Sequence, residues 1–368
     1  MRLLAGPIEL PDNLPRSETD KTELLDRFAS EIYGKIPHST DAFSAIHCRI
    51  IDDTLQYLTI TMQVGQRQFS VDAALWIPKQ AQRLKKVIVG LDFVGPAGVL
   101  PDNSFQLDPN ARVYSRPEFG ASNGSLTETL RGTSAYRWPV QLMLDHGYAV
   151  LLSCYGSWAP DCPKQIIKHG VLPLVRDKTA AISLWAWAYM RLIDAIQKLP
   201  AVQGSKIAVA GHSRLGKAAL WATANDPRID AVFANQSGCF GAAPGLHRIG
   251  ETRSQLVERF PHWVLPDAPK SRLDQHQLLS LAAPGKVYLG QAIDDTWADP
   301  LGSYAALIAA SRCWTANETG DWPEVRDLTE GPFDVATGSV GYHLRAGGHD
   351  LLPYDWRLFL DFLSRSDF

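Results

Sequence analysis

Several features are scarce or missing in this sequence of 368 residues, and each absence excludes a class of protein. No apolar run reaches the length of about 18 residues that a membrane-spanning helix needs, so a membrane span is excluded. No basic stretch of the kind that binds nucleic acid occurs, and the formal net charge at pH 7 is -3. The five cysteines lack C-x-x-C spacing, which argues against a disulfide scaffold and against a zinc site.

A secretory leader is also not visible. The apolar part of residues 1–11 is too short for a signal peptide. We expect either a protein that stays inside the cell or a chain that lacks its leader.

Apolar residues and tryptophan are what the sequence has in abundance. Hydrophobic residues make up 45% of the chain, enough for a sizeable core, and there are eleven tryptophans. We expect most tryptophans in the core. Exposed tryptophans stack on sugar rings, so their number favours a carbohydrate ligand. No internal repeat and no linker divides the chain, so we expect one domain over residues 1–368.

Strand and helix patterns alternate along most of the chain. Residues 1–40 predict an N-terminal arm with a helix at 21–33. Three alternating stretches, at 45–52, 58–64 and 69–77, predict antiparallel strands at the edge of a sheet. A buried central strand is then expected at 86–93. Further strands are expected at 148–153, 206–210, 230–234 and 286–290, and helices at 138–146, 180–199, 217–225 and 356–363.

This alternation predicts an α/β fold, with a mostly parallel sheet covered on both faces. Two long stretches, 94–137 and 240–283, are rich in Gly, Pro and Asn and predict irregular structure. Loops of that length usually carry function or pack as insertions.

One segment has the local order of a nucleophile elbow. The strand predicted at 206–210 runs into Gly211-His-Ser-Arg-Leu-Gly-Lys217 and then into a helix. Such a turn holds a serine hydroxyl clear of the backbone, where helix amides stabilise an oxyanion. Ser213 is therefore the candidate nucleophile, and His212 beside it is expected to pack. The spacing is G-x-S-x-x-G rather than G-x-S-x-G, so the second glycine is displaced.

A serine hydroxyl needs a base, and the base needs a group that orients it. In elbow enzymes the acid and the histidine follow the serine, in loops after later strands. Asp294, Asp295 and Asp299 follow the strand predicted at 286–290, and His349 lies in a glycine-bearing loop near the C-terminus. On pattern alone Asp294 fits a solvated side chain, and Asp299 fits a turn cap. The acid therefore stays open at this point.

At these positions the sequence resembles the glucuronoyl esterases, a family of carbohydrate esterases. The nucleophile motif of that family, G-[CH]-S-R-x-G-K, is matched throughout by Gly211–Lys217, displaced glycine included. Its histidine motif, R-x-G-x-H followed by D-W, is matched by Arg345-Ala-Gly-Gly-His349 and by Asp355-Trp356. The run Asp295–Pro300 is similar to the loop after the seventh strand in bacterial members.

The likeness spans nearly the whole chain and implies an α/β-hydrolase fold. That fold has a mostly parallel central sheet with antiparallel edge strands and helices on both faces, in a three-layer sandwich. The resemblance also implies that Ser213 is the nucleophile, that His349 is the base and that Arg214 helps to hold the oxyanion. The substrate-binding residues that it implies are Lys217, Glu251, Trp297 and Gln236. No metal and no cofactor is needed.

Two departures from the family pattern matter. Many members, the fungal ones especially, place the triad glutamate at the position of Gln236, and an amide cannot supply the charge that stabilises an imidazolium. Some bacterial relatives use an aspartate after the seventh strand, matched here by Asp295, with Asp299 as the alternative. The fungal enzymes also join cysteines beside the serine and the histidine in a disulfide. His212 and Asp350 stand there instead, so that bridge cannot form.

We therefore expect a monomeric serine esterase that cleaves the ester between a glucuronoyl carboxyl and an alcohol, as in lignin–glucuronoxylan linkages. Its partner is that substrate, with no nucleic acid and no membrane involved. The substrate points to a secreted or periplasmic protein, although no leader is visible. Two alternatives remain: an α/β-hydrolase esterase for acetyl or alkyl esters, and a carbohydrate-binding protein whose chemistry is lost.

Overall fold

The computed structural model describes residues 8, 10–37, 43–79, 81, 83–114, 122–175, 178–245, 249–314, 332–365 and 368. Residues 1–7, 9 and 38–40 of the predicted arm lie outside these described residues. The chain divides into two compact units. The first comprises Met1–Ile32, Ala210–Arg259 and Pro266–Phe368, and the second comprises Tyr33–Val209 and Phe260–Leu265. The expectation of one domain stays a prediction.

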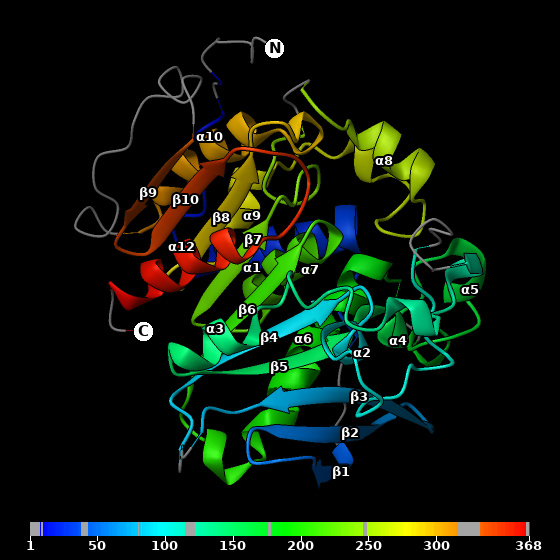
Figure 1. Cartoon of the computed structure of the whole chain (residues 1–368). Helices are drawn as coiled ribbons and strands as arrows, with labels where there is room; N and C mark the ends of the chain where they lie inside the picture. The colour runs from blue at the N-terminus through cyan, green and yellow to red at the C-terminus, as the bar shows by residue number, and fades with distance from the viewer. Residues whose placement is uncertain are drawn as a thin grey trace. The chain divides into compact units, whose positions relative to one another are not determined.

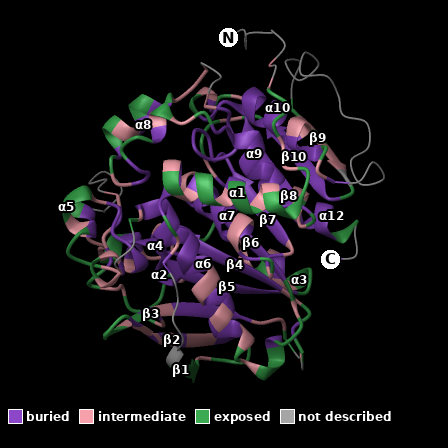
Figure 2. Ribbon diagram, turned by 180° about the vertical axis from the view of Figure 1, so that it is seen from behind, coloured by how far each residue is buried: buried purple, intermediate pink, exposed green. Residues whose placement is uncertain are grey.

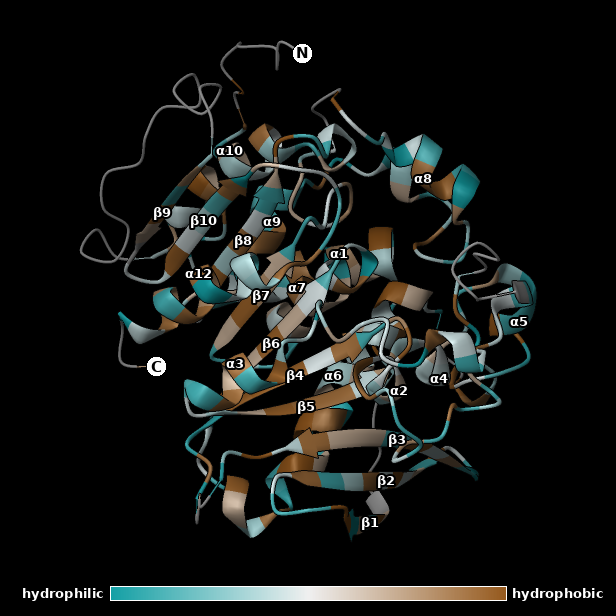
Figure 3. Cartoon of the chain, in the orientation of Figure 1, coloured by the Kyte–Doolittle hydropathy of each residue, from teal (hydrophilic) through white to brown (hydrophobic). Residues whose placement is uncertain are grey.

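The second unit contains an antiparallel edge of the sheet (Figure 1). Strands β1 (Phe43–Ile50), β2 (Leu55–Val64) and β3 (Arg67–Trp76) pair antiparallel in that order, which confirms the three predicted edge strands. Next come β5 (Tyr148–Cys154), antiparallel to β3, and β4 (Lys86–Asp92), parallel to β5. Every residue of β5 is buried, as expected for a strand covered on both faces, and Figure 3 shows this strand as hydrophobic.

Helices cover the strands of the second unit. In Figure 1, α3 (Val140–Asp145) lies in front of β5, and α6 (Ala181–Gln197) passes behind the strands. Helix α6 is buried along most of its length, and the indole of Trp185 donates to the carbonyl of Ala159 at 3.0 Å. The shorter helices and turns of the unit are α2 (Pro96–Val99), η3 (Ser122–Gly124), η4 (Glu128–Leu130), α4 (Tyr155–Trp158), α5 (Pro163–Ile166), η5 (Leu172–Leu174) and η6 (Pro200–Val202).

Strand β6 (Lys206–His212) belongs to both units, because the boundary falls inside it. In the first unit β7 (Ala231–Asn235), β8 (Lys286–Ala292) and β10 (Val340–Arg345) pair in parallel. Strand β9 (Phe333–Thr337) closes this edge antiparallel to β10. The strand order is β1-β2-β3-β5-β4-β6-β7-β8-β10-β9. The carboxyl ends of β6, β7, β8 and β10 lead into the loops that carry the candidate site.

The helices of the first unit lie on both faces of its strands. Figure 1 draws α12 (Pro353–Ser364) in front of them, and Figure 2, seen from behind, draws α1 (Glu18–Phe28) on the opposite side. The ring of Phe359 in α12 stacks on Phe233 of β7, with centroids 4.8 Å apart. The other helices and turns are η1 (Ala29–Tyr33), which ends in the second unit, α7 (Arg214–Asn225), α8 (Arg253–Arg259), η7 (Ala268–Lys270), α9 (Gln275–Ser280), η8 (Thr296–Ala298) and α10 (Pro300–Ser311). No helix among the described residues is long and apolar enough to cross a membrane.

The structure corrects one expectation about secondary structure and contains a helix, α10, that was not predicted. The stretch 240–283 is not wholly irregular, because it contains α8 and α9. Helix α8 has 7 residues and α9 has 6, so each is too short for a helical period to show in the sequence. Helix α10 was not predicted, although Asp299 and Pro300 are its N-cap and its first residue, a sequence signal for a helix start.

Candidate functional site

The turn between β6 and α7 is the strained part of the site. Ser213 is the one residue between β6 and α7. Its backbone angles are φ 58° and ψ -125°, which residues other than glycine rarely adopt. The Ser213 N–H donates to the carbonyl of Asn235 at the end of β7, 2.8 Å away. Strain of this kind persists where surrounding contacts fix it, and it concentrates at functional sites. Ser213 thus lies at the N-terminus of α7, as the elbow pattern predicts.

Two glycines let the chain close this turn. A Cβ at Gly211 would overlap with the backbone of Leu215, so only glycine fits there. A Cβ at Gly216 would lie 3.0 Å from the carbonyl oxygen of Gly211 and 3.0 Å from Cβ of Ser237. The second position where the backbone packs too closely for a side chain is therefore Gly216, three residues after the serine. This accounts physically for the displaced glycine of the G-x-S-x-x-G motif.

A histidine and an aspartate from two different loops meet beside each other. His349 Nδ1 lies 2.6 Å from Asp295 Oδ2. Because an ionised carboxylate only accepts hydrogen bonds, Nδ1 is the donor, which leaves Nε2 to exchange a proton. The side chain of His349 is 44% exposed and that of Asp295 only 5%. The exposed ring with a buried carboxylate behind it has the geometry of a base and its orienting acid.

The other aspartates of the same loop have different surroundings. Asp299 is the N-cap of α10, and its Oδ1 accepts from the N–H of Gly302 at 3.0 Å. Asp294 is exposed. Of the two acids that the sequence left open, Asp295 is the one beside His349. Asp299 is a cap, as its sequence pattern suggested, and the element that it caps is α10.

The side chain of Lys217 is buried in the first turns of α7. Its ammonium donates to the carbonyls of Ser237 and Cys239, each at 2.5 Å. Burial lowers the pKa of Lys217, and the nearby carboxylate of Glu251 partly opposes that shift. Burial also raises the pKa of the Cys239 thiol to about 12, so this cysteine stays protonated. Arg214, the first residue of α7, is half-buried.

Two of the predicted substrate-binding residues lie next to each other. The N–H of Glu251 donates to the carbonyl of Trp297, 3.0 Å away. The Trp297 side chain is 46% exposed, whereas the other nine tryptophans among the described residues are buried. An exposed indole is chemically suited to the face of a sugar ring.

Gln236 lies at the start of the loop after β7 and is 1% exposed. Its Oε1 accepts from the N–H of Asp350 at 2.9 Å, which occupies the carbonyl end of the amide. Its assignment as a substrate contact stays a prediction.

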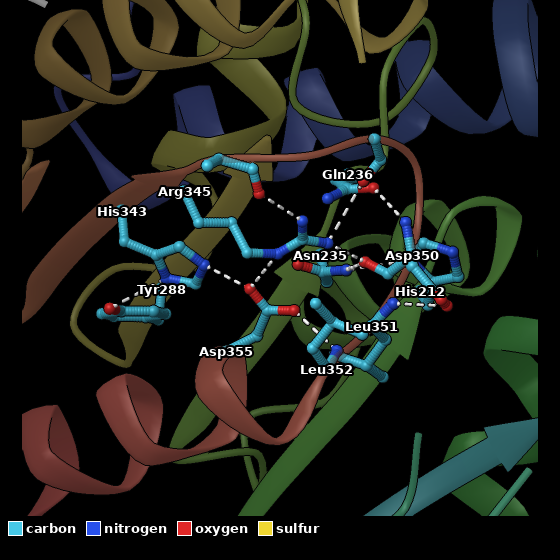
Figure 4. A network of polar contacts seen from close by, with 12 residues as sticks. His212, Asn235, Gln236, Tyr288, His343, Arg345, Asp350, Leu351, Leu352 and Asp355 are labelled. Atoms are coloured by element: carbon cyan, nitrogen blue, oxygen red, sulfur yellow. Dashed lines mark hydrogen bonds and ion pairs between the residues drawn. The ribbon is translucent and has the colours of Figure 1, made fainter. Parts of the chain in front are cut away.

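Sequence reasoning missed the residues that hold the histidine loop (Figure 4). Arg345 Nη2 donates to the carbonyl of Asp350 at 2.7 Å, and its Nε donates to Asp355 Oδ1 at 2.8 Å. Asp355 Oδ1 also lies 2.8 Å from His343 Nε2. The motif R-x-G-x-H with D-W contains two of these residues, but the motif itself gave them no role. The loop is thus tied to α12 through a buried ion pair.

No cluster of three or more His, Cys, Asp or Glu side chains in the described part of the chain could hold a metal ion. The five cysteines, all described, are free thiols.

Comparison with known proteins identifies the family. A family model described as glucuronyl esterase of fungi matches residues 174–317. Carbohydrate esterase MZ0003 from an unknown prokaryotic organism is 30% identical over 370 residues, which cover 93% of this chain and 83% of the relative. The chain belongs to the glucuronoyl esterase family of carbohydrate esterases.

The solved glucuronoyl esterase from Solibacter usitatus is similar to this esterase with a TM-score of 0.78 and 29% identity, over 94% of this chain and 92% of that one. A 4-O-methyl-glucuronoyl methylesterase 1 from Sodiomyces alcalophilus is 31% identical over 155 residues, 37% of this chain and 31% of the relative. The chain is accordingly a carboxylic ester hydrolase with the α/β-hydrolase fold, a mostly parallel sheet with helices around it. The fungal model covers the Ser213 turn and Asp295 but ends before His349.

Proposed function

We propose that this esterase hydrolyses esters of glucuronic acid and its 4-O-methyl ether, as in lignin–glucuronoxylan linkages, through a Ser213-His349-Asp295 triad and an acyl-enzyme. The contact of 2.6 Å between His349 Nδ1 and Asp295 Oδ2 carries the proposal. The names of the relatives support the glucuronoyl substrate.

The first step is attack by Ser213 on the ester carbonyl. His349 Nε2 takes the hydroxyl proton, and Asp295 stabilises the imidazolium that forms. The protonated ring then donates its proton to the leaving alkoxide, and the acyl group remains on the serine. Water then attacks the acyl carbon while His349 Nε2 takes one of its protons. The bond from the acyl carbon to Ser213 Oγ breaks, His349 returns that proton to Ser213 Oγ, and the free glucuronate leaves.

Developing negative charge on the carbonyl oxygen meets the N-terminus of α7. The positive end of the dipole of this twelve-residue helix, with its first backbone N–H groups, lies there. Arg214, the first residue of this helix, supplies a further positive charge. These donors are fixed before the reaction starts, so they lower the barrier without reorganising.

The sugar is recognised by groups near the serine. Trp297 offers an exposed face for the pyranose ring, and Glu251 accepts from its hydroxyls. Lys217 acts mainly through its positive charge, because two carbonyls occupy the ammonium.

Hydrolysis of the benzyl ester of glucuronic acid tests this proposal against acetylated xylan as the alternative substrate. We expect turnover of the benzyl ester to fall by about 10⁵-fold or more in Ser213→Ala. We also expect a fluorophosphonate probe to label the wild type but not that variant. Faster turnover of the acetyl ester would refute the substrate, and unimpaired turnover in Ser213→Ala would refute the nucleophile.

A further inference from the structure

The residue that follows His349 is held at both of its backbone groups by two neighbouring side chains. Gln236 Oε1 accepts from the Asp350 N–H at 2.9 Å, and Asn235 Nδ2 donates to the Asp350 carbonyl at 2.8 Å (Figure 4). Asn235 is 0% exposed and Gln236 is 1% exposed. Bonds so deeply buried are not exchanged for bonds to water.

An unusual backbone angle at Gln236 allows both side chains to reach Asp350. Consecutive side chains of a strand point to opposite faces, so two neighbours do not normally reach one residue. Gln236, however, has φ 48° just after the end of β7. Its N–H donates to the carbonyl of Gly290 at 2.8 Å, which fixes the bend. A positive φ at a residue other than glycine costs free energy, and such strain persists where the surroundings over-determine it.

Asn235 also reaches the residue before the nucleophile. Its Nδ2 lies 2.9 Å from Nδ1 of His212. Because the Asp350 carbonyl only accepts, the NH₂ end of the amide must face it, and the second hydrogen of the same NH₂ points at the imidazole. His212 Nδ1 is therefore the acceptor, and the proton of this ring is on Nε2. The rings of His212 and His349 lie with centroids 4.5 Å apart.

We propose that Asn235 and Gln236 form a clamp that positions His349 relative to Ser213, a role that rests on the proposed function. The clamp connects His212, next to the nucleophile, with Asp350, next to the base. The hydrogen bonds of both side chains run to His212 and to the backbone of Asp350, so we assign both as positioning residues.

The decisive variant is Gln236→Leu, which keeps the size of the side chain and removes the acceptor for the Asp350 N–H. A base displaced by about 1 Å can cost about 100-fold in rate. We expect kcat on the benzyl ester to fall by about 10- to 100-fold, with KM within about threefold. We expect Gln236→Glu, which keeps an accepting oxygen, to recover most of kcat.

Gln291 supplies the matched control. It is a glutamine of β8 at 0% exposure, and neither end of its amide has a hydrogen-bond partner among the described residues. Gln291→Leu therefore removes a buried glutamine without touching the clamp. Equal kcat in Gln236→Leu and Gln291→Leu would overturn the proposal. A drop confined to Gln236→Leu and recovered by Gln236→Glu supports it.

Asn235→Asp tests the other half of the clamp. The carboxylate has the shape of the amide, but it turns both donated hydrogens into lone pairs facing the Asp350 carbonyl and His212. We expect kcat to fall by about 10- to 100-fold while KM stays within about threefold. An unchanged kcat in this variant would overturn the part assigned to Asn235.

Hydrogen exchange across residues 346–352, measured without substrate, separates this proposal from the proposed function. We expect faster exchange in Gln236→Leu than in Gln291→Leu. Faster exchange with an unchanged rate of fluorophosphonate labelling at Ser213 would overturn the positioning role. If the wild type is labelled at Ser213 but does not hydrolyse glucuronate esters, the proposed substrate is refuted. The clamp can still be tested in that case, because the labelling rate at Ser213 can be compared between Gln236→Leu and Gln291→Leu.

Discussion

The serine turn and the histidine loop reach the same site by different physical means. The turn at Ser213 is fixed by the backbone, through two glycines and a hydrogen bond to the carbonyl of Asn235. The histidine loop is fixed by side chains, from Asp295, Arg345 and the clamp residues. A change of glycine should therefore break the turn, whereas a change of a polar side chain should break the loop.

Among the residues that hold Ser213 and His349 in place, the largest effect on kcat should come from the loop, at Asp295. Asp295→Asn leaves the shape of the side chain but removes the charge and lets the amide favour the wrong tautomer of His349. We expect kcat on the benzyl ester to fall by about 10⁴-fold, with the melting temperature nearly unchanged. Steady-state kinetics and thermal unfolding of the purified variant check this.

Two other aspartates of the same loop serve as controls. Asp294→Asn changes an exposed side chain, and Asp299→Asn keeps a residue that tolerates positive φ and caps α10. Both should keep kcat within about threefold. A loss in Asp299→Asn comparable to that in Asp295→Asn would mean that Asp299 is the triad acid.

The next largest effect should come from the turn, at Gly211. A methyl group at Gly211→Ala meets the backbone of Leu215, which cannot move without opening the first turn of α7. We expect a loss of about 3 kcal/mol in the free energy of unfolding, and loss of fluorophosphonate labelling at Ser213. In Gly216→Ala the approach is 3.0 Å, so the loss should be smaller. Equal stability of the two variants would contradict the backbone account of the turn.

The same contrast decides how much of the site can be predicted from sequence. Ser213 and its glycines are local, so the strand–turn–helix pattern located them. Asp295 was located by chain order and family likeness. Its preference over Asp299 as the acid depends on the contact with His349, which lies 54 positions further along the chain. The clamp escaped prediction because it depends on a positive φ at Gln236, and nothing in Asn235-Gln-Ser-Gly238 requires that angle. The edge strands and central strands were predictable from their periodicity, and the short helices α8 and α9 were not.

A smaller effect should appear at alkaline pH, at the buried ammonium of Lys217 on the serine side. Lys217 on the serine side donates to two carbonyls, and burial lowers its pKa below that of the unfolded chain. Between the two pKa values the unfolded chain binds more protons, so the Lys217 contribution to stability rises with pH in that window. Below the folded-state pKa both states are protonated, and the contribution is flat.

The free energy of unfolding of the wild type, minus that of Lys217→Met, should therefore rise with pH in the alkaline range, by at most about 1.4 kcal/mol per pH unit. Denaturant unfolding of both proteins at several pH values measures the difference, in which the other titrating groups cancel. A difference that falls with pH would contradict the assigned direction.

The smallest effect should be at Gly348, directly before the base. A Cβ there meets nothing within 4 Å, and its backbone is not in the region that glycine alone favours. Gly348→Ala should therefore change the free energy of unfolding by less than about 0.5 kcal/mol and leave kcat within about twofold. Gly348 lies one residue before the base, and Gly211 lies two residues before the nucleophile. If closeness to a catalytic residue decided the effect, the two substitutions would lower stability and kcat by similar amounts. Similar damage from both substitutions would mean that the backbone fixes the histidine loop as well, and the contrast with the serine turn would fail.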